Sequence, residues 1–294
     1  MRLRDYLSLL KPKILTAMLL LYALSHLASS GSVGKLNLRL FLLGLIAVFT
    51  AVAGSNALNC YLERELDAKM MRTRRRPLPR GTIKPRRALI LSLSLLSASP
   101  LITLIPEPRV LYPLLLYLGG VSLYIILYTM LLKSRSRWNI LAVAPSAATP
   151  IWYGWLLGGS SFDLRPLILG LTASLWTLPH LWSLAYVYAR DYRRGRVPML
   201  PAVEEEGKAL KAILLSLTAL ITSSLILIPF SKTLIYPASA LALSIVLSYL
   251  GLRLRYDPSR RRAWKLFKAT SPYIILLLTA YAFDQIWETL LVCG

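Results

Sequence analysis

The sequence is poor in cysteine, histidine and charge, and each shortage excludes a class of protein. Its 294 residues include two cysteines and two histidines, which argues against a disulfide framework, a cysteine-based zinc site or a histidine-rich metal centre. Charged residues make up 16% of the chain, against about 25% in a soluble domain. Because 56% of the residues are hydrophobic and the mean hydropathy is +0.56, the chain is neither an ordinary soluble enzyme nor disordered.

Long apolar runs recur along the whole chain instead. A bilayer core of about 30 Å needs about 20 apolar residues per helix. We therefore predict an all-α fold, a polytopic membrane helix bundle in one transmembrane domain over residues 1–294. The first run is interpreted as a retained helix rather than a signal peptide, since further spans follow it. The nine predicted spans are 14–30, 40–62, 88–105, 110–132, 138–158, 166–189, 209–229, 233–252 and 270–292.

Acidic residues are scarce, and the excess of basic ones is placed unevenly. The chain carries 35 Lys and Arg against 13 Asp and Glu, a net charge of +22. Thirty of the 35 basic residues lie in alternate connections, on the side of the N-terminus. This positive-inside bias predicts a cytoplasmic N-terminus and, with nine spans, an external C-terminus. Attraction of these basic residues to anionic lipid headgroups explains the net charge without nucleic acid. We therefore expect a multi-pass protein of the plasma membrane.

An oxygen-rich stripe lies at the cytoplasmic end of the second run. Asn59, Glu63 and Asp67 are spaced four residues apart, which places them within about 80° of arc along about 12 Å of helix. Mg²⁺ prefers oxygen ligands and usually binds one or two carboxylates together with substrate phosphates. The alternative is an ordinary helix end whose charges pair in water, such as Glu65 with Lys69.

An arginine-rich loop, 72–81, follows this stripe directly. Taken alone, the loop is typical of a segment that contacts lipid headgroups. Beside metal-binding acids, however, Arg72 and Arg76 can bind phosphate oxygens through their forked guanidinium groups. Together the two segments predict a receptor for a metal-bound diphosphate.

A third group of polar residues ends the sixth run. Tyr186 and Arg190 share a helix face, and Asp191 is expected at the same membrane depth as Asp67, across a cavity. The alternative is that Arg190 and Asp191 form a local pair at the interface. His180, eleven residues before Asp191, lies within about 20° of it in azimuth but about 16 Å deeper.

At these residues the sequence resembles the UbiA superfamily of intramembrane prenyltransferases, and within it the branch that farnesylates protohaem IX. The superfamily motif Asn-x-x-x-Asp-x-x-x-Asp is matched at Asn59, with Glu63 in place of its first Asp. The branch pattern continues through 67–81 and returns as Tyr-x-x-x-Lys-Asp-Tyr at 186–192, where Arg190 replaces Lys. Pro-Met-Leu-Pro follows at 198–201, and Pro-His-x-Trp precedes at 179–182. In the fifth span the usual glycines are replaced by small residues, 142–149.

The resemblance implies a Mg²⁺-dependent enzyme that transfers farnesyl from farnesyl diphosphate to a vinyl group of protohaem IX, with water added, giving haem O for terminal oxidases. It implies that Asn59, Glu63, Asp67 and Asp191 are catalytic and hold the metal ion. Its active site is expected on the cytoplasmic side, and a downstream haem-modifying enzyme or oxidase assembly partner is a further expected partner. His180 is a candidate axial ligand of the haem iron. The expected diphosphate-binding residues are Lys13, Arg64, Arg72, Arg76, Tyr186 and Arg190.

Two other interpretations stay open at this point. One keeps the chemistry but changes the acceptor to a quinone-ring precursor or a prenyl-glycerol lipid. The other is a transporter, which often has helices broken at matching midplane positions. In this sequence the acids gather at cytoplasmic helix ends instead.

Overall fold

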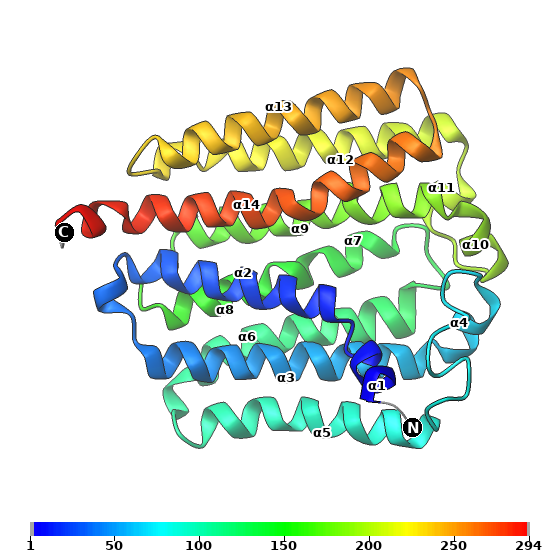
Figure 1. Cartoon of the computed structure of the whole chain (residues 1–294), viewed down its shortest axis with the longest axis horizontal. Coiled ribbons are helices and arrows are strands. Elements are labelled where there is room, and N and C mark those ends of the chain that lie inside the picture. The colour runs from blue at the N-terminus through cyan, green and yellow to red at the C-terminus, as the bar shows by residue number, and fades with distance from the viewer. Residues whose placement is uncertain (1–2, 293–294) are drawn as a thin grey trace.

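The computed structural model describes residues 3–292, and Cys293 lies outside them. The described chain is a bundle of long helices that run side by side along the longest axis (Figure 1). Nine of its helical stretches are long and apolar enough to cross a membrane, which confirms the predicted number of spans among the described residues. Their bounds are Pro12–Ser30 (α2), Leu38–Leu62 (α3), Pro85–Leu104 (α5), Pro108–Leu132 (η2, α6 and η3), Asn139–Leu157 (α7, η4 and α8), Leu164–Val187 (α9), Glu206–Phe230 (α12 and η5), Ile235–Tyr256 (α13) and Arg260–Trp287 (the spanning part of α14).

Four short α-helices gather at one end of the bundle. Helices α1 (Leu3–Leu9), α4 (Arg64–Lys69), α10 (Ala189–Arg194) and α11 (Leu200–Val203) all lie there, whereas α14 (Arg260–Val292) finishes at the opposite end (Figure 1). The long basic connections therefore share one end of the molecule. Which membrane side this end faces stays a prediction.

The last helix begins ten residues earlier than predicted. The apolar run starts near residue 270, but α14 is already helical at Arg260. Hydropathy marks only the segment in hydrocarbon, whereas a helix continues into the interface if its charged side chains reach water. This extra length brings Arg260 beside the short helices at the same end of the bundle, where it borders a cavity with Arg194.

Close backbone packing joins the central helices α2 and α8 (Thr149–Leu157). Ser25 Oγ donates to the Ile151 carbonyl at 2.7 Å, and Ser29 Oγ donates to the Trp155 carbonyl at 2.6 Å. A Cβ built on Gly154 would lie 2.4 Å from the Tyr22 carbonyl oxygen. Small residues allow such approach in membranes, where van der Waals packing rather than the hydrophobic effect holds helices together.

We expect Gly154→Ala to destabilise the bundle. Its Cβ would meet backbone, which cannot rotate away, so the overpacking should cost about 1–3 kcal/mol. Thermal unfolding in detergent should show a Tm lower by at least about 3 °C. The matched control is Gly119→Ala in α6 (Leu111–Ser122), because its Cβ would meet nothing within 4 Å. Equal Tm values for the two variants would contradict this packing argument.

Two spans are irregular where the sequence predicts plain helix. The fourth continues from α6 as a π-helix, η3 (Leu123–Leu132), and the fifth consists of α7 (Asn139–Val143), the 3₁₀ turn η4 (Ala144–Ala147) and α8. Pro145 in η4 lacks an N–H and cannot continue an α-helical hydrogen-bond pattern. π-helical segments are rare and are frequently found at functional sites. Both irregular segments contribute side chains to the site described next.

Candidate active site

The predicted oxygen-rich stripe is present and buried. Asn59, Glu63 and Asp67 are 2%, 6% and 2% exposed, respectively. Although α3 ends at Leu62 and α4 begins at Arg64, the Glu63 N–H donates to the Asn59 carbonyl and the Asp67 N–H to the Glu63 carbonyl. These hydrogen bonds keep the four-residue helical spacing across the break between α3 and α4. The three side chains therefore stay on successive turns.

Each side chain of the stripe has its own cationic partner. Lys11 Nζ donates to Asn59 Oδ1 at 2.6 Å, and Arg76 Nη1 donates to Asp67 Oδ2 at 2.7 Å. Lys133 forms an ion pair and a hydrogen bond with Glu63. We call these six residues the inner polar cluster: Lys11, Asn59, Glu63, Asp67, Arg76 and Lys133.

Mutual charge outweighs burial for three members of the inner polar cluster. Burial alone raises the pKa of Glu63, but Lys133 and Lys11 outweigh it, so the pKa lies below its usual value. For Lys133, burial lowers the pKa, and the Glu63 carboxylate reverses this to a raised value. Burial likewise opposes the charge of Arg76, yet Asp67 raises its pKa. Lys11 differs, because burial dominates and its pKa is lowered.

Lys11 occupies a strained backbone position between α1 and α2. Its φ is 50°, in the left-handed region that side chains other than glycine rarely adopt. Such strain persists only where the surrounding structure imposes it, and it is often found at functional sites. Here the turn lets the Lys11 ammonium reach Asn59, while Lys13, the residue selected from sequence, is exposed.

The π-helix η3 supplies partners that the sequence argument did not assign. Asn59 Nδ2 donates to Thr129 Oγ1 at 3.0 Å, and Lys11 Nζ donates to the Tyr124 hydroxyl at 3.3 Å. Thr129 Oγ1 in turn donates to the Tyr124 carbonyl, five residues earlier. The signal that could have found them is the run Tyr124-x-x-x-Tyr128-Thr129-x-x-x-Lys133, polar groups within an otherwise apolar span.

Asp191 lies 7% exposed on α10 and holds the arginine-rich loop. Its two carboxylate oxygens accept from the backbone N–H groups of Met71 at 3.0 Å and Arg72 at 2.8 Å. From the other side, Thr73 Oγ1 donates to the Asp67 carbonyl at 3.0 Å. The carboxylates of Asp67 and Asp191 are thus linked through one short loop, and the predicted role of Asp191 as a metal ligand stays a prediction.

We expect Asp191→Ala to release this loop. The substitution removes two charge-assisted hydrogen bonds, each worth about 1.5–3 kcal/mol. Because about 1.4 kcal/mol corresponds to a tenfold change in an equilibrium constant, the population of the opened loop should rise at least tenfold. Trypsin should therefore cut after the exposed Arg74 or Arg75 at least about tenfold faster than in the wild type. Asp257→Ala is the control, since Asp257 is a 60% exposed carboxylate paired only with Arg262. Unchanged cleavage would show that Asp191 does not hold the loop.

The other predicted diphosphate-binding residues lie outside the inner polar cluster. Arg64 contacts the Tyr61 carbonyl and Glu65, and the Tyr186 hydroxyl donates to Glu206. Arg72 and Arg190 line a separate cavity beside Asp191. Of the predicted cations, Arg76 reaches a predicted carboxylate, Asp67, through its guanidinium group, whereas Arg72 reaches Asp191 through its backbone amide.

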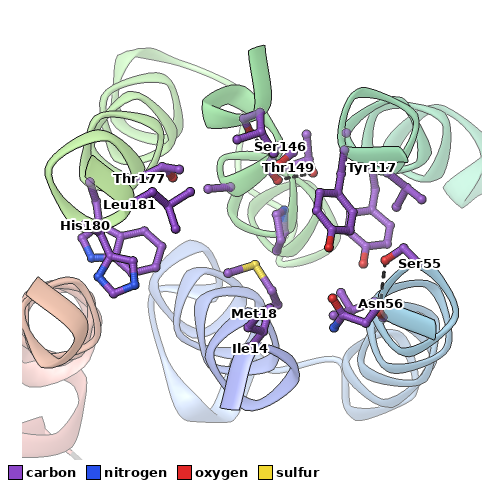
Figure 2. Close-up of a pocket in the computed structure, with 18 residues that line it drawn as sticks. Ile14, Met18, Ser55, Asn56, Tyr117, Ser146, Thr149, Thr177, His180 and Leu181 are labelled. Carbon is purple, nitrogen blue, oxygen red and sulfur yellow. Dashed lines mark hydrogen bonds between the residues drawn. The ribbon is translucent and has the colours of Figure 1, made fainter. Parts of the chain in front are cut away.

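An apolar cavity adjoins the inner polar cluster. It is lined from α2, α3, the fourth and fifth spans and α9, and Tyr124, which accepts from Lys11, is part of its wall. Figure 2 shows Met18 and Ile14 on one side, Tyr117 and Asn56 on another, and His180 at the far left. The polar cluster and a largely hydrocarbon-lined space therefore meet at one point of the bundle.

His180 borders this cavity in a fixed orientation. Its ring is stacked between Trp176 at 4.9 Å and Phe267 at 4.4 Å between ring centroids. Nδ1 lies 2.9 Å from Thr270 Oγ1, whose hydroxyl donates to the Phe267 carbonyl. A Thr270 hydroxyl that donates to Phe267 leaves Nδ1 as the donor to Thr270 and Nε2 as the acceptor.

The donor chemistry of the inner polar cluster fits Mg²⁺. Asn59, Glu63 and Asp67 provide oxygen atoms, and a site of this type needs only one or two carboxylates when substrate phosphates complete it. Among the side chains that the structure describes, no three from Cys, His, Asp or Glu form a group that could hold a metal ion alone. The carboxylates that now pair with Lys133 and Arg76 are among the oxygen donors that such an ion would need.

Comparison with known proteins gives consistent matches over nearly the whole chain. A model described as the UbiA prenyltransferase family matches residues 17–278. The protoheme IX farnesyltransferase of Desulforudis audaxviator is 36% identical, over 97% of this chain and 89% of that protein. That of Pyrobaculum neutrophilum is 37% identical, over 95% of this chain and 99% of that protein.

Solved structures share the fold. A digeranylgeranylglyceryl phosphate synthase structure aligns with a TM-score of 0.78 at 20% identity, covering 97% of this chain and 99% of that one. A UbiA homologue from Archaeoglobus fulgidus bound to DMAPP and Mg²⁺ aligns with a TM-score of 0.71 at 18% identity, covering 96% and 99%. At these identities the likeness concerns the helix arrangement alone.

Proposed function

Because the chain belongs to the UbiA prenyltransferase family and is a prenyltransferase, we propose that it transfers farnesyl from farnesyl diphosphate to a vinyl group of protohaem IX. Water adds in the same reaction, and the product is haem O, which serves terminal oxidases. The single observation that carries the proposal is the contact between the inner polar cluster and the apolar cavity, made through Lys11 and Tyr124. A prenyl diphosphate has the same two parts, an anionic head and an apolar tail.

The basic residues of the inner polar cluster would bind the diphosphate. Breaking the allylic C–O bond places negative charge on the leaving group, and Lys11, Arg76 and Lys133 stabilise that charge where it develops. A divalent ion held by Asn59, Glu63 and Asp67 would add Lewis-acid stabilisation of the same oxygens. We propose Mg²⁺, since a structural neighbour was solved with DMAPP and Mg²⁺. Asp191 holds the loop that carries Arg76, and we propose it as a further catalytic ligand of the metal ion.

The apolar cavity protects the allylic cation from stray water until the acceptor is in place. The vinyl π electrons form the new C–C bond with C1 of the farnesyl cation. The positive charge then moves to the carbon next to the porphyrin ring, where water adds and loses a proton. Every atom of the hydroxyalkyl side chain is thus accounted for.

We propose His180 as an axial ligand of the haem iron. Iron binding requires the tautomer in which Nδ1 donates to Thr270 and Nε2 carries a free lone pair, and the contact with Thr270 is compatible with it. Stacking by Trp176 and Phe267 holds the ring at the cavity wall. The iron itself takes no part in the transfer.

The rival acceptors are a quinone-ring precursor and a prenyl-glycerol lipid. The digeranylgeranylglyceryl phosphate synthase, whose name is related to a prenyl-glycerol lipid, is 20% identical to this chain. The two protoheme IX farnesyltransferases are 36% and 37% identical to it. The latter cover the chain almost from end to end. Haem is therefore the acceptor we favour.

The test is mass spectrometry of the product that the purified protein makes from haem B and farnesyl diphosphate, with and without Mg²⁺. We expect haem O only when all three are present. Parallel reactions offer a phenolic acid and a prenyl-glycerol phosphate as acceptors. Turnover of one of these in place of haem B would overturn the haem assignment, and haem O formation after complete chelation would overturn the metal assignment.

The surroundings of the enzyme follow from the charge pattern. We propose a plasma-membrane location with the short-helix end in the cytoplasm, since thirty of the 35 basic residues lie in the connections at that end. This places the inner polar cluster on the cytoplasmic side. A downstream haem-modifying enzyme or oxidase assembly partner would take the apolar product directly from the bilayer.

A further inference from the structure

A second basic cavity borders the arginine-rich loop. Arg72 comes from that loop, Arg190 and Arg194 from α10, and Arg260 from the start of α14. Across the described part of the chain, none of the four forms an ion pair with a carboxylate. We call this space the arginine pocket.

The arginine pocket carries a net positive charge, because four arginines and one aspartate line it. The single carboxylate in its wall belongs to Asp191, which already accepts from the Met71 and Arg72 backbone amides. Four guanidinium groups from three separate segments therefore face one space. Such groups bind carboxylates and phosphates through paired N–H donors.

This pocket and the inner polar cluster have no residue in common. The cluster takes its cations from Lys11, Arg76 and Lys133, each in contact with a stripe residue. The loop joins the two sites, because Arg76 contacts Asp67 while the Arg72 amide contacts Asp191. The arginine pocket and the inner polar cluster are thus neighbours joined by one loop.

A row of aromatic rings leads from the arginine pocket to the apolar cavity. The Arg72 guanidinium lies over the Tyr188 ring, in the pocket wall, at 5.4 Å from its centroid. Consecutive contacts then follow along the interface of α9 and α14, and the last two rings line the apolar cavity. In order, the rings belong to Tyr188, Trp264, Phe267, His180 and Trp176, with centroid separations of 6.2, 5.0, 4.4 and 4.9 Å.

We infer that the arginine pocket binds the two carboxylates of the porphyrin acceptor. A porphyrin of this kind has a flat aromatic body with two propionate groups on one edge and its vinyl groups on the other. Arginines at one end of an aromatic row and the reaction cavity at the other match that pattern of charge. The inference rests on the proposed function, and it assigns the pocket to the acceptor rather than to the diphosphate.

The test is the double variant Arg194→Gln/Arg260→Gln, assayed with haem B and with its dimethyl ester. Both side chains are exposed, so the fold should be retained, and thermal unfolding checks this. Wild type should show a KM for the ester about tenfold above that for haem B, which corresponds to about 1.4 kcal/mol. The variant should show a KM for haem B raised about tenfold, with unchanged KM for the ester and for farnesyl diphosphate.

A matched control removes two arginines from a different basic cavity on the same end of the protein. Arg4 and Arg80 line that cavity with Arg75, and Arg4→Gln/Arg80→Gln should leave KM for haem B unchanged. An equal rise in KM for haem B and its ester would overturn the inference, as would a rise only for farnesyl diphosphate. A change seen in anionic lipid vesicles but absent in neutral detergent would assign the pocket to lipid headgroups and overturn it too.

The two proposals fail in distinguishable ways. If wild type converts haem B while the Arg194→Gln/Arg260→Gln variant has the wild-type KM, this inference alone is wrong. If wild type binds and converts no haem B but prenylates another acceptor, the proposed function is wrong and this inference falls with it. Haem binding without turnover can be measured by the shift of the haem absorption band. This measurement distinguishes weak binding from slow chemistry.

Discussion

Asp67→Asn is expected to lower the rate of prenyl transfer by at least about 100-fold, the loss seen when one preorganised group that stabilises transition-state charge is removed. The substitution keeps the shape of the side chain and removes its negative charge. Asp67 is buried, accepts from Arg76 at 2.7 Å and is one of the proposed metal ligands. An amide binds Mg²⁺ less strongly than a carboxylate, so the Mg²⁺ concentration that gives half-maximal rate should also rise.

The measurement is product formation against Mg²⁺ concentration, with Glu65→Gln as the control. Glu65 lies two residues away on the same short helix, its side chain is 81% exposed, and its salt bridge is with Arg64 alone. This variant should keep the wild-type rate and Mg²⁺ dependence. A wild-type rate in Asp67→Asn would remove Asp67 from the proposed site, and equal losses in both variants would point to disturbance of α4.

Sequence patterns predict the spans and the family because both depend on local signals. In the described part of the chain nine apolar runs give nine helical spans, since a hydrocarbon core requires all backbone groups of a span to be paired within it. The resemblance through Asn59, Asp67 and 186–201 is confirmed by the family match over residues 17–278. Helix ends were less accurate, as α14 shows, because hydropathy does not report where a charged helix begins.

The partners of the predicted site residues could not be obtained in the same way. Lys11 and Lys133 reach the stripe from elements 48 and 70 residues away, and such distances are closed only by tertiary packing. Lys11 also depends on a positive φ, which nothing in the local sequence requires. In the same way, spacing placed Asp191 at the depth of Asp67, but it gave no indication that its oxygens hold the loop backbone.

The ion pair of Glu63 with Lys133 allows stability and catalysis to be measured separately. Lys133→Met leaves the Glu63 carboxylate buried with its main partner removed, which should cost about 3–5 kcal/mol of folding stability. Glu63→Gln/Lys133→Met removes both charges, and most of the lost stability should return. Prenyl transfer should stay at least about 100-fold below wild type in both, because the diphosphate has lost a cation.

Acid should reduce the defect of the single variant. In wild type, Lys133 and Lys11 hold the pKa of Glu63 low, so this carboxylate stabilises the fold above its unfolded pKa and loses that effect as pH falls through the folded pKa. Without Lys133, burial should raise the Glu63 pKa, and protonation then relieves the buried charge. The Tm gap between Lys133→Met and wild type should therefore narrow as pH falls.

The exposed pair of Asp163 with Arg165 at the opposite end of the bundle provides the control. Its side chains are 40% and 30% exposed, and pairs of this kind contribute about 0–1 kcal/mol, so Asp163→Asn/Arg165→Met should differ little from wild type in Tm or rate. Recovery of both Tm and prenyl transfer in Glu63→Gln/Lys133→Met would make the buried pair purely structural. Recovery of Tm alone would mean that the two buried charges serve substrate binding rather than folding stability, and that a pair without charges is compatible with a stable bundle.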